Sequence, residues 1–208
     1  MKIESMVWSV QDPCGDKVLY DTLNTGSTLI LLADGMSGLE NADKAADIAI
    51  KEVHRYMCLH STDDPCIAIS QAIVEADKAI RGASYELHCK MGTALLLLLV
   101  QDRVAYFTGI GDVRLYHALS DGSVVLLTHD HQVIVTGCSY LTQSIRGRGG
   151  VNPQVNICSL SSADRLLLCT DGAYRCYPIG MFLDGTWRSF PMDIHDDDCS
   201  FILVSLVD

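Results

Sequence analysis

The chain has 208 residues, of which 49% are apolar and 20% are charged, and its formal net charge is -11. This composition is typical of a globular protein and excludes a disordered chain, and the length leads us to expect a single domain over residues 1–208. The negative charge argues against nucleic acid or an anionic membrane as the main partner.

The nine cysteines are scattered, several of them within apolar runs, and no two have CxxC spacing. Such a set is typical of reduced thiols in a cytoplasmic protein and not of a disulfide or zinc framework. The longest aliphatic run, residues 94–100, is too short to cross a bilayer. We therefore expect a cytoplasmic protein without a membrane segment.

The first part of the chain predicts one strand and two helices. Residues 27–34, STLILLAD, form a short aliphatic run that indicates a buried strand. Residues 40–58 carry apolar side chains at helical spacing. These are Ala46, Ala49, Ile50, Val53 and Met57. A second helix is predicted within residues 63–82, with Asp64 as its N-cap and Pro65 at its first position.

From residue 92 the chain consists of short apolar runs interrupted by Gly, Asp or Asn, a pattern typical of strands. The predicted strand segments are residues 93–102, 103–112, 113–128, 154–160, 164–172 and 199–207. The third of these contains a hairpin turn at Asp121-Gly122. Many strands together with a helical pair predict an α+β fold, in which sheet packs on sheet and helices lie outside.

The dipeptide Asp-Gly occurs four times, at Asp34, Asp121, Asp171 and Asp184. Asp and Gly are common in turns for conformational reasons alone, and a turn is a sufficient explanation at Asp121 and Asp184. Asp34 and Asp171 differ because each ends an aliphatic run. On the dipeptide alone, a turn remains the commoner explanation for these two as well.

Further carboxylates lie beside predicted strands. Residues 196–198 are three consecutive aspartates before the last strand, Asp12 follows the N-terminal apolar segment, and Asp112 lies between two strands. If these carboxylates converge they repel one another, and a positive charge must offset that repulsion. Mg²⁺ and Mn²⁺ are the ions that use such oxygen-rich sites.

At this point the chain resembles a known family, the metal-dependent Ser/Thr protein phosphatases of type 2C in their compact bacterial form. The resemblance runs through blocks in family order and covers nearly the whole chain. The blocks are SVQD, LILLADGMSGLENADKAADIA, MGTALLLLLVQDRVAYFTGIGDVRLYHAL, LTHDH with LTQSIRG, DRLLLCTDGAYR and DDCSFILVSL. Their order and spacing are much more specific than any single Asp-Gly.

The resemblance implies a central antiparallel β-sandwich flanked by α-helices on both faces, in four layers α-β-β-α. It also implies hydrolysis of phosphoserine and phosphothreonine in proteins by a water that two Mn²⁺ or Mg²⁺ ions activate. Asp34 and Asp171 would be the catalytic carboxylates. The implied metal ligands are Asp12, Asp34, the Gly35 carbonyl, Asp171 and Asp197, with Asp112 as the residue associated with a third ion. A phosphorylated protein and a cognate Ser/Thr kinase are the implied partners.

The chain departs from the family pattern at several positions. Val7 stands where an arginine commonly grips the phosphate, which leaves the phosphate-binding residue unknown. Arg146 and Arg148 are the candidates to replace it. Arg175 stands where many relatives have a second aspartate, which argues against a third ion at Asp112. The segment between LTHDH and LTQSIRG is also shorter than the family's usual flap region.

These departures leave two alternatives open. One is a catalytically weak or inactive type 2C-like binding module that keeps the fold. The other is a phosphatase of small phosphoesters, which a reduced flap would admit.

Overall fold

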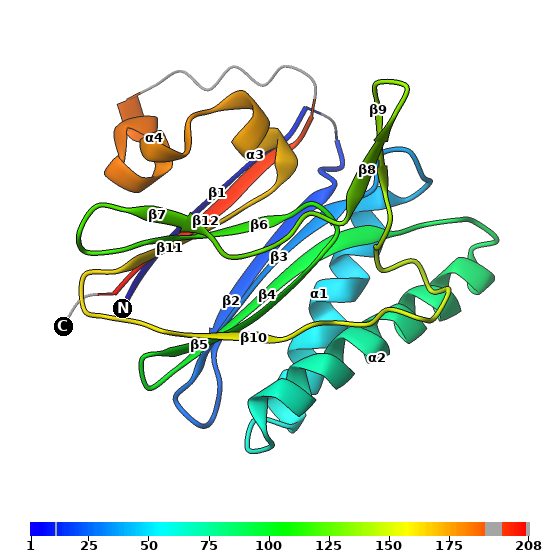
Figure 1. The fold of residues 1–208 in the computed structure, drawn as a ribbon. Coiled ribbons are helices and arrows are strands. Elements are labelled where there is room, and N and C mark those ends of the chain that lie inside the picture. Colours follow the sequence, from blue (N-terminus) through cyan, green and yellow to red (C-terminus); the bar gives the residue numbers. More distant parts are fainter. Residues whose placement is uncertain (11, 190–196, 207–208) are drawn as a thin grey trace.

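Two five-stranded antiparallel sheets packed face to face form the centre of the molecule (Figure 1). The computed structural model describes residues 1–10, 12–189 and 197–206. One sheet has the order β1 (Lys2–Trp8), β12 (Cys199–Ser205), β11 (Arg165–Cys169), β6 (Arg114–Ala118) and β7 (Val124–Leu126). The other has the order β10 (Asn156–Ser159), β5 (Val104–Ile110), β4 (Thr93–Gln101), β3 (Thr28–Gly35) and β2 (Asp16–Thr22).

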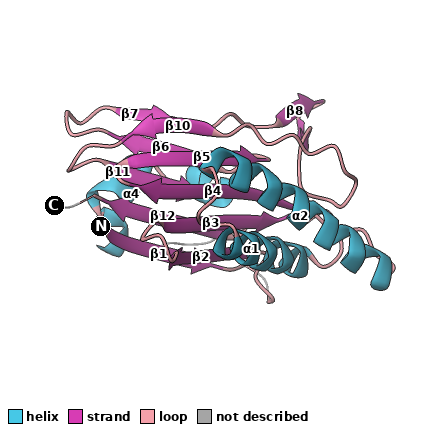
Figure 2. Cartoon of the chain, turned by 90° about the horizontal axis from the view of Figure 1, so that it is seen from below, coloured by secondary structure: helices cyan, strands magenta, loops and turns pink. Residues whose placement is uncertain are grey.

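Two long helices, α1 (Ala42–Leu59) and α2 (Pro65–Glu86), cover the outer face of the β3–β4 sheet (Figure 2). Leu29 and Leu31 of β3 pack against these helices, whereas Ile30 and Leu32 pack between the two sheets. The strand is buried on both faces, which is why its sequence is continuously apolar and not alternating. The predicted start of α2 is confirmed, since the Asp64 carboxylate accepts hydrogen bonds from two backbone N–H groups of the first turn.

Short helical segments cover the outer face of the other sheet, namely α3 (Asp171–Cys176), α4 (Ile179–Asp184) and the 3₁₀ helix η1 (Thr186–Ser189). They pack through aromatic side chains. Phe182 and Trp187 lie with ring centroids 4.7 Å and 5.0 Å from Phe201 of β12. The predicted order of layers, α-β-β-α, is therefore confirmed, although one outer layer consists of helices of only four to six residues.

The strand ends determine where a site can form. β3 ends and β4 begins at the same end of the sandwich at which β11 ends and β12 begins, because both pairs belong to antiparallel sheets (Figure 1). The loops that follow these ends therefore meet across the two sheets. In the described part of the chain, no helix is both long enough and apolar enough to cross a membrane.

Candidate metal centre

A cleft of about 420 Å³ lies at this end of the sandwich, and four of the predicted carboxylates line it. They are Asp34, Asp112, Asp171 and Asp197, together with the backbone of Gly35. Asp34 is the penultimate residue of β3, Asp171 begins α3 directly after β11, and Asp197 precedes β12. The structure thus brings together residues that are far apart in the sequence, since 163 positions separate Asp34 from Asp197.

A further carboxylate, Asp16, belongs to this group and was missed by the sequence reasoning. It is the first residue of β2 and lies opposite Asp34 in the antiparallel register. Its side chain is only 2% exposed, and the Thr170 hydroxyl donates a hydrogen bond to its Oδ2 at 3.1 Å. The only sequence signal for Asp16 is its register with Asp34, which requires knowing that β2 exists.

Asp12, the residue expected at this place, does not reach the cleft. It is exposed in the loop between β1 and β2 and lines a separate, smaller cavity with Pro13. The Asp198 carboxylate fixes this loop by accepting hydrogen bonds from the backbone N–H groups of Val10 at 2.8 Å and Gly15 at 2.6 Å. This tether places the start of β2, and with it Asp16, beside Asp34, whereas Asp12 lies away from the cleft.

The four Asp-Gly pairs fall into two structural classes. Gly122 and Gly185 have φ of +89° and +81°, so they are turn glycines, as expected at Asp121 and Asp184. Gly35 and Gly172 instead permit close approach of backbone. A Cβ on Gly35 would lie 2.3 Å from the Ala42 carbonyl oxygen, and one on Gly172 would lie 2.1 Å from the Asp198 carbonyl oxygen. The glycines after Asp34 and Asp171 therefore allow neighbouring segments to close around the cleft.

The carboxylates of the cleft repel one another. Burial raises the pKa of Asp34 well above its ordinary value, and repulsion from Asp16 and Asp171 adds to the effect. Burial likewise raises the pKa of Asp16 to about 7, with repulsion from Asp198 adding to it. For Asp112 the same two causes, burial and then repulsion from Asp171, raise the pKa to about 6. Such a cluster is stable in its ionised form only when cations offset the charge.

The donor atoms of the cleft fit hard divalent cations. Carboxylate oxygens and a backbone carbonyl are available from Asp34, Gly35, Asp171 and Asp197, and no cysteine or histidine is among the described residues that line the cleft. Mg²⁺ and Mn²⁺ prefer this all-oxygen set. The raised pKa values indicate that the cleft needs positive charge, and the donor atoms indicate that a hard divalent cation would supply it.

Arg175 supplies a positive charge at the edge of the carboxylate group. Its guanidinium lies 2.6 Å from Asp171 Oδ2 and 3.4 Å from Asp112 Oδ2. Tyr174 supports the same region, since its hydroxyl donates to the backbone carbonyl of Asp112 at 2.9 Å. The guanidinium of Arg175 thus lies between the carboxylates of Asp112 and Asp171. Its positive charge would repel a third ion at this place.

The two arginine candidates for phosphate binding have different positions. Arg146 lines the cleft, whereas Arg148 lines only neighbouring cavities. The loop that carries them is attached to α2 by the buried Asp77 carboxylate, which accepts hydrogen bonds from the N–H groups of Arg146, Gly147 and Gly149 at 3.2, 2.7 and 2.8 Å. Three backbone donors on one carboxylate hold the Arg146 backbone in place beside the cleft.

The shortened flap segment is a β-hairpin formed by β8 (Gln132–Val135) and β9 (Cys138–Leu141), which projects from the sandwich (Figure 1). Ser139, Tyr140 and Leu141 contribute to the cleft wall. The hairpin also carries exposed apolar side chains, with Ile134 76% and Tyr140 56% exposed. It therefore presents an apolar surface next to the carboxylates.

Comparisons with known proteins agree with this geometry. A profile of the family described as Protein phosphatase 2C matches residues 7–194. Protein phosphatase PhpP of Streptococcus pneumoniae (strain D39) is 28% identical over 177 residues, which cover 76% of this chain and 72% of that protein.

Two solved structures are similar over the full length of this chain. The catalytic domain of the serine/threonine protein phosphatase PstP, in complex with two manganese ions, has a TM-score of 0.79 and 20% identity, and the match covers 100% of this chain and 98% of that one. Serine/threonine phosphatase Stp1 from Staphylococcus aureus has a TM-score of 0.83 and 19% identity, with 100% and 95% covered. At these identities the structural likeness establishes the fold.

Proposed function

Because the chain belongs to the protein phosphatase 2C family and is a metal-dependent phosphoprotein phosphatase, we propose that its catalytic centre is the carboxylate cleft. Phosphoserine and phosphothreonine side chains of protein substrates are hydrolysed there. The observation that carries the proposal is the convergence of Asp16, Asp34, Asp171 and Asp197, whose mutual repulsion requires cations.

We propose that the metal ligands are Asp34, the Gly35 carbonyl, Asp171 and Asp197, with Asp16 in the place for which Asp12 was expected. Mn²⁺ or Mg²⁺ in such a site supplies the positive charge that activates a water molecule and balances the charge of the phosphate. The residues of the chain contribute rigidity to this site. Gly35 and Gly172 let the backbone of neighbouring segments close on the carboxylates, and Asp198 fixes the loop before Asp16.

Among the described residues that line the cleft, none supplies a thiol nucleophile. Cys169, which precedes Thr170 and Asp171, is fully buried in the core of the outer layer, and burial strongly raises the pKa of its thiol. A protonated, inaccessible sulfur does not attack a phosphate ester. Direct attack by water is therefore the mechanism that agrees with the side chains present.

Arg146 is proposed as the phosphate-binding residue. It is the one cation among the described residues that line the cleft, and Asp77 holds its backbone in place. A guanidinium offers two parallel donors to phosphate oxygens, so it can hold the ester against the carboxylate centre. Arg148 lies outside the cleft, which makes Arg146 the better candidate for this role.

A protein substrate is favoured over a small phosphoester by the β8–β9 hairpin. The hairpin exposes Val133, Ile134, Val135 and Tyr140, and of these Tyr140 lines the cleft, so the hairpin offers apolar area that a peptide can cover but a small ester cannot reach. We also propose that a Ser/Thr kinase in the same cell produces the substrate. The free thiols of the described cysteines support the proposed cytoplasmic location.

The direct test measures turnover of a phosphothreonine peptide and of p-nitrophenyl phosphate with Mn²⁺. Wild-type protein should hydrolyse both, and Asp34→Asn and Asp171→Asn should lower turnover by about a hundredfold or more while the circular dichroism spectrum stays unchanged. Full activity in both variants would exclude the cleft as the catalytic centre. Wild-type protein that binds Mn²⁺ without turnover would instead identify a binding module.

A further inference from the structure

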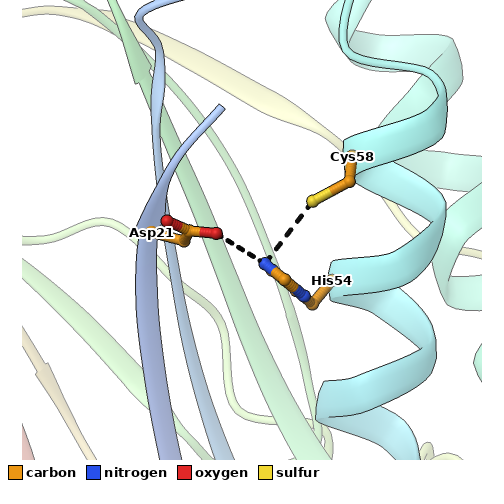
Figure 3. A group of neighbouring side chains, drawn as sticks. All are labelled: Asp21, His54 and Cys58. Carbon is orange, nitrogen blue, oxygen red and sulfur yellow. Dashed lines mark hydrogen bonds and ion pairs between the residues drawn. The ribbon is translucent and has the colours of Figure 1, made fainter. Parts of the chain in front are cut away.

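Three side chains of residue types that can ligate a metal meet on the surface where α1 lies beside β2 (Figure 3). Asp21 comes from β2, and His54 and Cys58 come from α1. His54 Nε2 lies 2.8 Å from Asp21 Oδ2 and 3.4 Å from Cys58 Sγ. One ligand atom from each residue lies within 4.8 Å of the other two, and this is the one such trio of His, Cys, Asp or Glu found in the described part of the chain.

The local structure explains why the three side chains converge. His54 and Cys58 are four residues apart in a helix, so they project from the same face one turn apart. In β2, Leu19 packs against the helix-side core, and Asp21, two residues further on, points to the same side of the sheet. The helix and the strand thus place an oxygen, a nitrogen and a sulfur around a single point.

A single Nε2 atom lies between Asp21 and Cys58, and its protonation state decides which of the two it serves. A ring nitrogen either carries a proton or has a free lone pair. If Nε2 carries the proton, it donates to Asp21, and Cys58 then has no acceptor at Nε2. If Nε2 is unprotonated, it accepts from the Cys58 thiol, and its lone pair then faces the Asp21 carboxylate. A cation between the three groups satisfies all three donor atoms at once.

We propose that Asp21, His54 and Cys58 form a Zn²⁺ site, with a fourth coordination position open to water. Thiolate sulfur and imidazole nitrogen select Zn²⁺ over Mg²⁺ and Mn²⁺, in contrast with the oxygen donors of the cleft. Tetrahedral zinc with bonds of about 2.0–2.3 Å places its ligand atoms about 3.3–3.8 Å apart. The observed separations are 2.8 and 3.4 Å from Nε2 and at most 4.8 Å between Asp21 and Cys58, so side-chain rotations would have to adjust all three to reach that geometry.

The site lies far from the carboxylate cleft but on elements that contribute to it. Asp21 is five residues along β2 from Asp16, about 17 Å at the rise of a strand. His54 is twelve residues along α1 from Ala42, which contacts Gly35, about 18 Å at the rise of a helix. A bound ion would therefore connect α1 to β2 at the end away from the cleft, and it would stabilise the folded protein without touching the catalytic carboxylates.

The experiment uses the full chain, stripped of metal and then supplied with excess Mg²⁺ to saturate the oxygen donors of the cleft. Co²⁺ is added as a spectroscopic probe for Zn²⁺, because a thiolate ligand gives an intense sulfur-to-cobalt charge-transfer band. We expect one equivalent of Co²⁺ to produce this band and Zn²⁺ to displace it. Cys58→Ser should abolish the band, and Asp21→Asn and His54→Gln should weaken binding about tenfold or more.

Two variants serve as matched controls. His60→Gln removes a surface histidine that is paired with a carboxylate, Asp63, at 2.8 Å but has no sulfur beside it. Cys66→Ser removes a half-buried thiol near a carboxylate, Asp64, without a histidine. Both should bind Co²⁺ like the wild type, since neither touches the trio.

Zn²⁺ should also raise the melting temperature of the wild type by several degrees and protect Cys58 at least tenfold against alkylation, read by peptide mass in the unmutated chain. Absence of a thiolate band, a band that survives in Cys58→Ser, or equal alkylation with and without Zn²⁺ would each overturn the assignment. These readouts do not depend on phosphatase activity, so they decide the zinc site separately from the catalytic proposal.

Discussion

In the metal-free protein, raising the pH from about 5 to about 8 should lower the free energy of unfolding. Burial, followed by repulsion from neighbouring carboxylates, raises the pKa of Asp16 from 3.8 to about 7, and in the unfolded chain the same group ionises near 3.8. The folded state therefore binds more protons than the unfolded state between these values. A carboxyl of this kind stabilises the fold below pH 3.8, and this stabilisation is lost as the pH rises to about 7.

The size of the effect follows from the shift. Between pH 5 and about 7 the shift of Asp16 spans about two pKa units, which at about 1.4 kcal/mol each give a ceiling of about 3 kcal/mol. This is a large part of the 5–15 kcal/mol that is typical of a folded domain. Mn²⁺ should restore most of the loss at pH 8, because the ion offsets the repulsion that the ionised carboxylates create. Urea denaturation of chelator-treated protein at several pH values, with and without Mn²⁺, measures both quantities.

Asp16→Asn should reduce the dependence on pH, since one of the titrating groups is gone and Asp34 loses the repulsion from Asp16. Asp12→Asn is the matched control and should leave the slope unchanged, because Asp12 is exposed outside the cleft. A free energy of unfolding that stays constant or rises between pH 5 and 8 in metal-free wild-type protein would refute the reasoning. So would a slope that persists undiminished in Asp16→Asn.

Three further predictions concern the walls of the cleft. Arg146→Ala should raise KM for a phosphothreonine peptide about tenfold or more, whereas Arg148→Ala should leave KM nearly unchanged in steady-state assays. Arg175→Met should tighten Mn²⁺ binding several-fold, as measured by calorimetry, because it removes the guanidinium that competes with the ion for Asp171. Weaker binding would contradict this. Gly172→Ala should lower the free energy of unfolding by about 2–4 kcal/mol through its contact with backbone, and Gly122→Ala, which meets nothing within 4 Å, by only about 1–2 kcal/mol.

The buried strands and the long helices could be predicted from local sequence alone. β3 and β4 are continuously aliphatic because both of their faces are buried, and α2 carries its own start signal in Asp64 and Pro65. By contrast, β2 has one apolar face and three exposed residues at its end, and β8 has an exposed apolar run. Neither pattern distinguishes a strand from a loop until its partner strand is known.

The cleft was predictable where its carboxylates directly follow aliphatic runs, as at Asp34 and Asp171. It was not predictable at Asp16, because that residue is selected by cross-strand register and by the hydrogen bonds of Asp198 to the preceding loop. Both are long-range contacts, and the resemblance of SVQD to the family's opening motif pointed to Asp12 instead. The role of Asp77 in holding Arg146 was hidden for the same reason, since 69 positions separate them.

The central claim is that carboxylates from distant parts of the chain jointly bind two divalent ions. Anomalous diffraction at the manganese absorption edge, from crystals grown with Mn²⁺, tests this most directly. We expect two strong peaks inside the cleft, both next to Asp34, one facing Asp171 and Asp197 and the other on the Asp16 side. A cleft without peaks at saturating Mn²⁺, or manganese bound only elsewhere on the surface, would contradict the account.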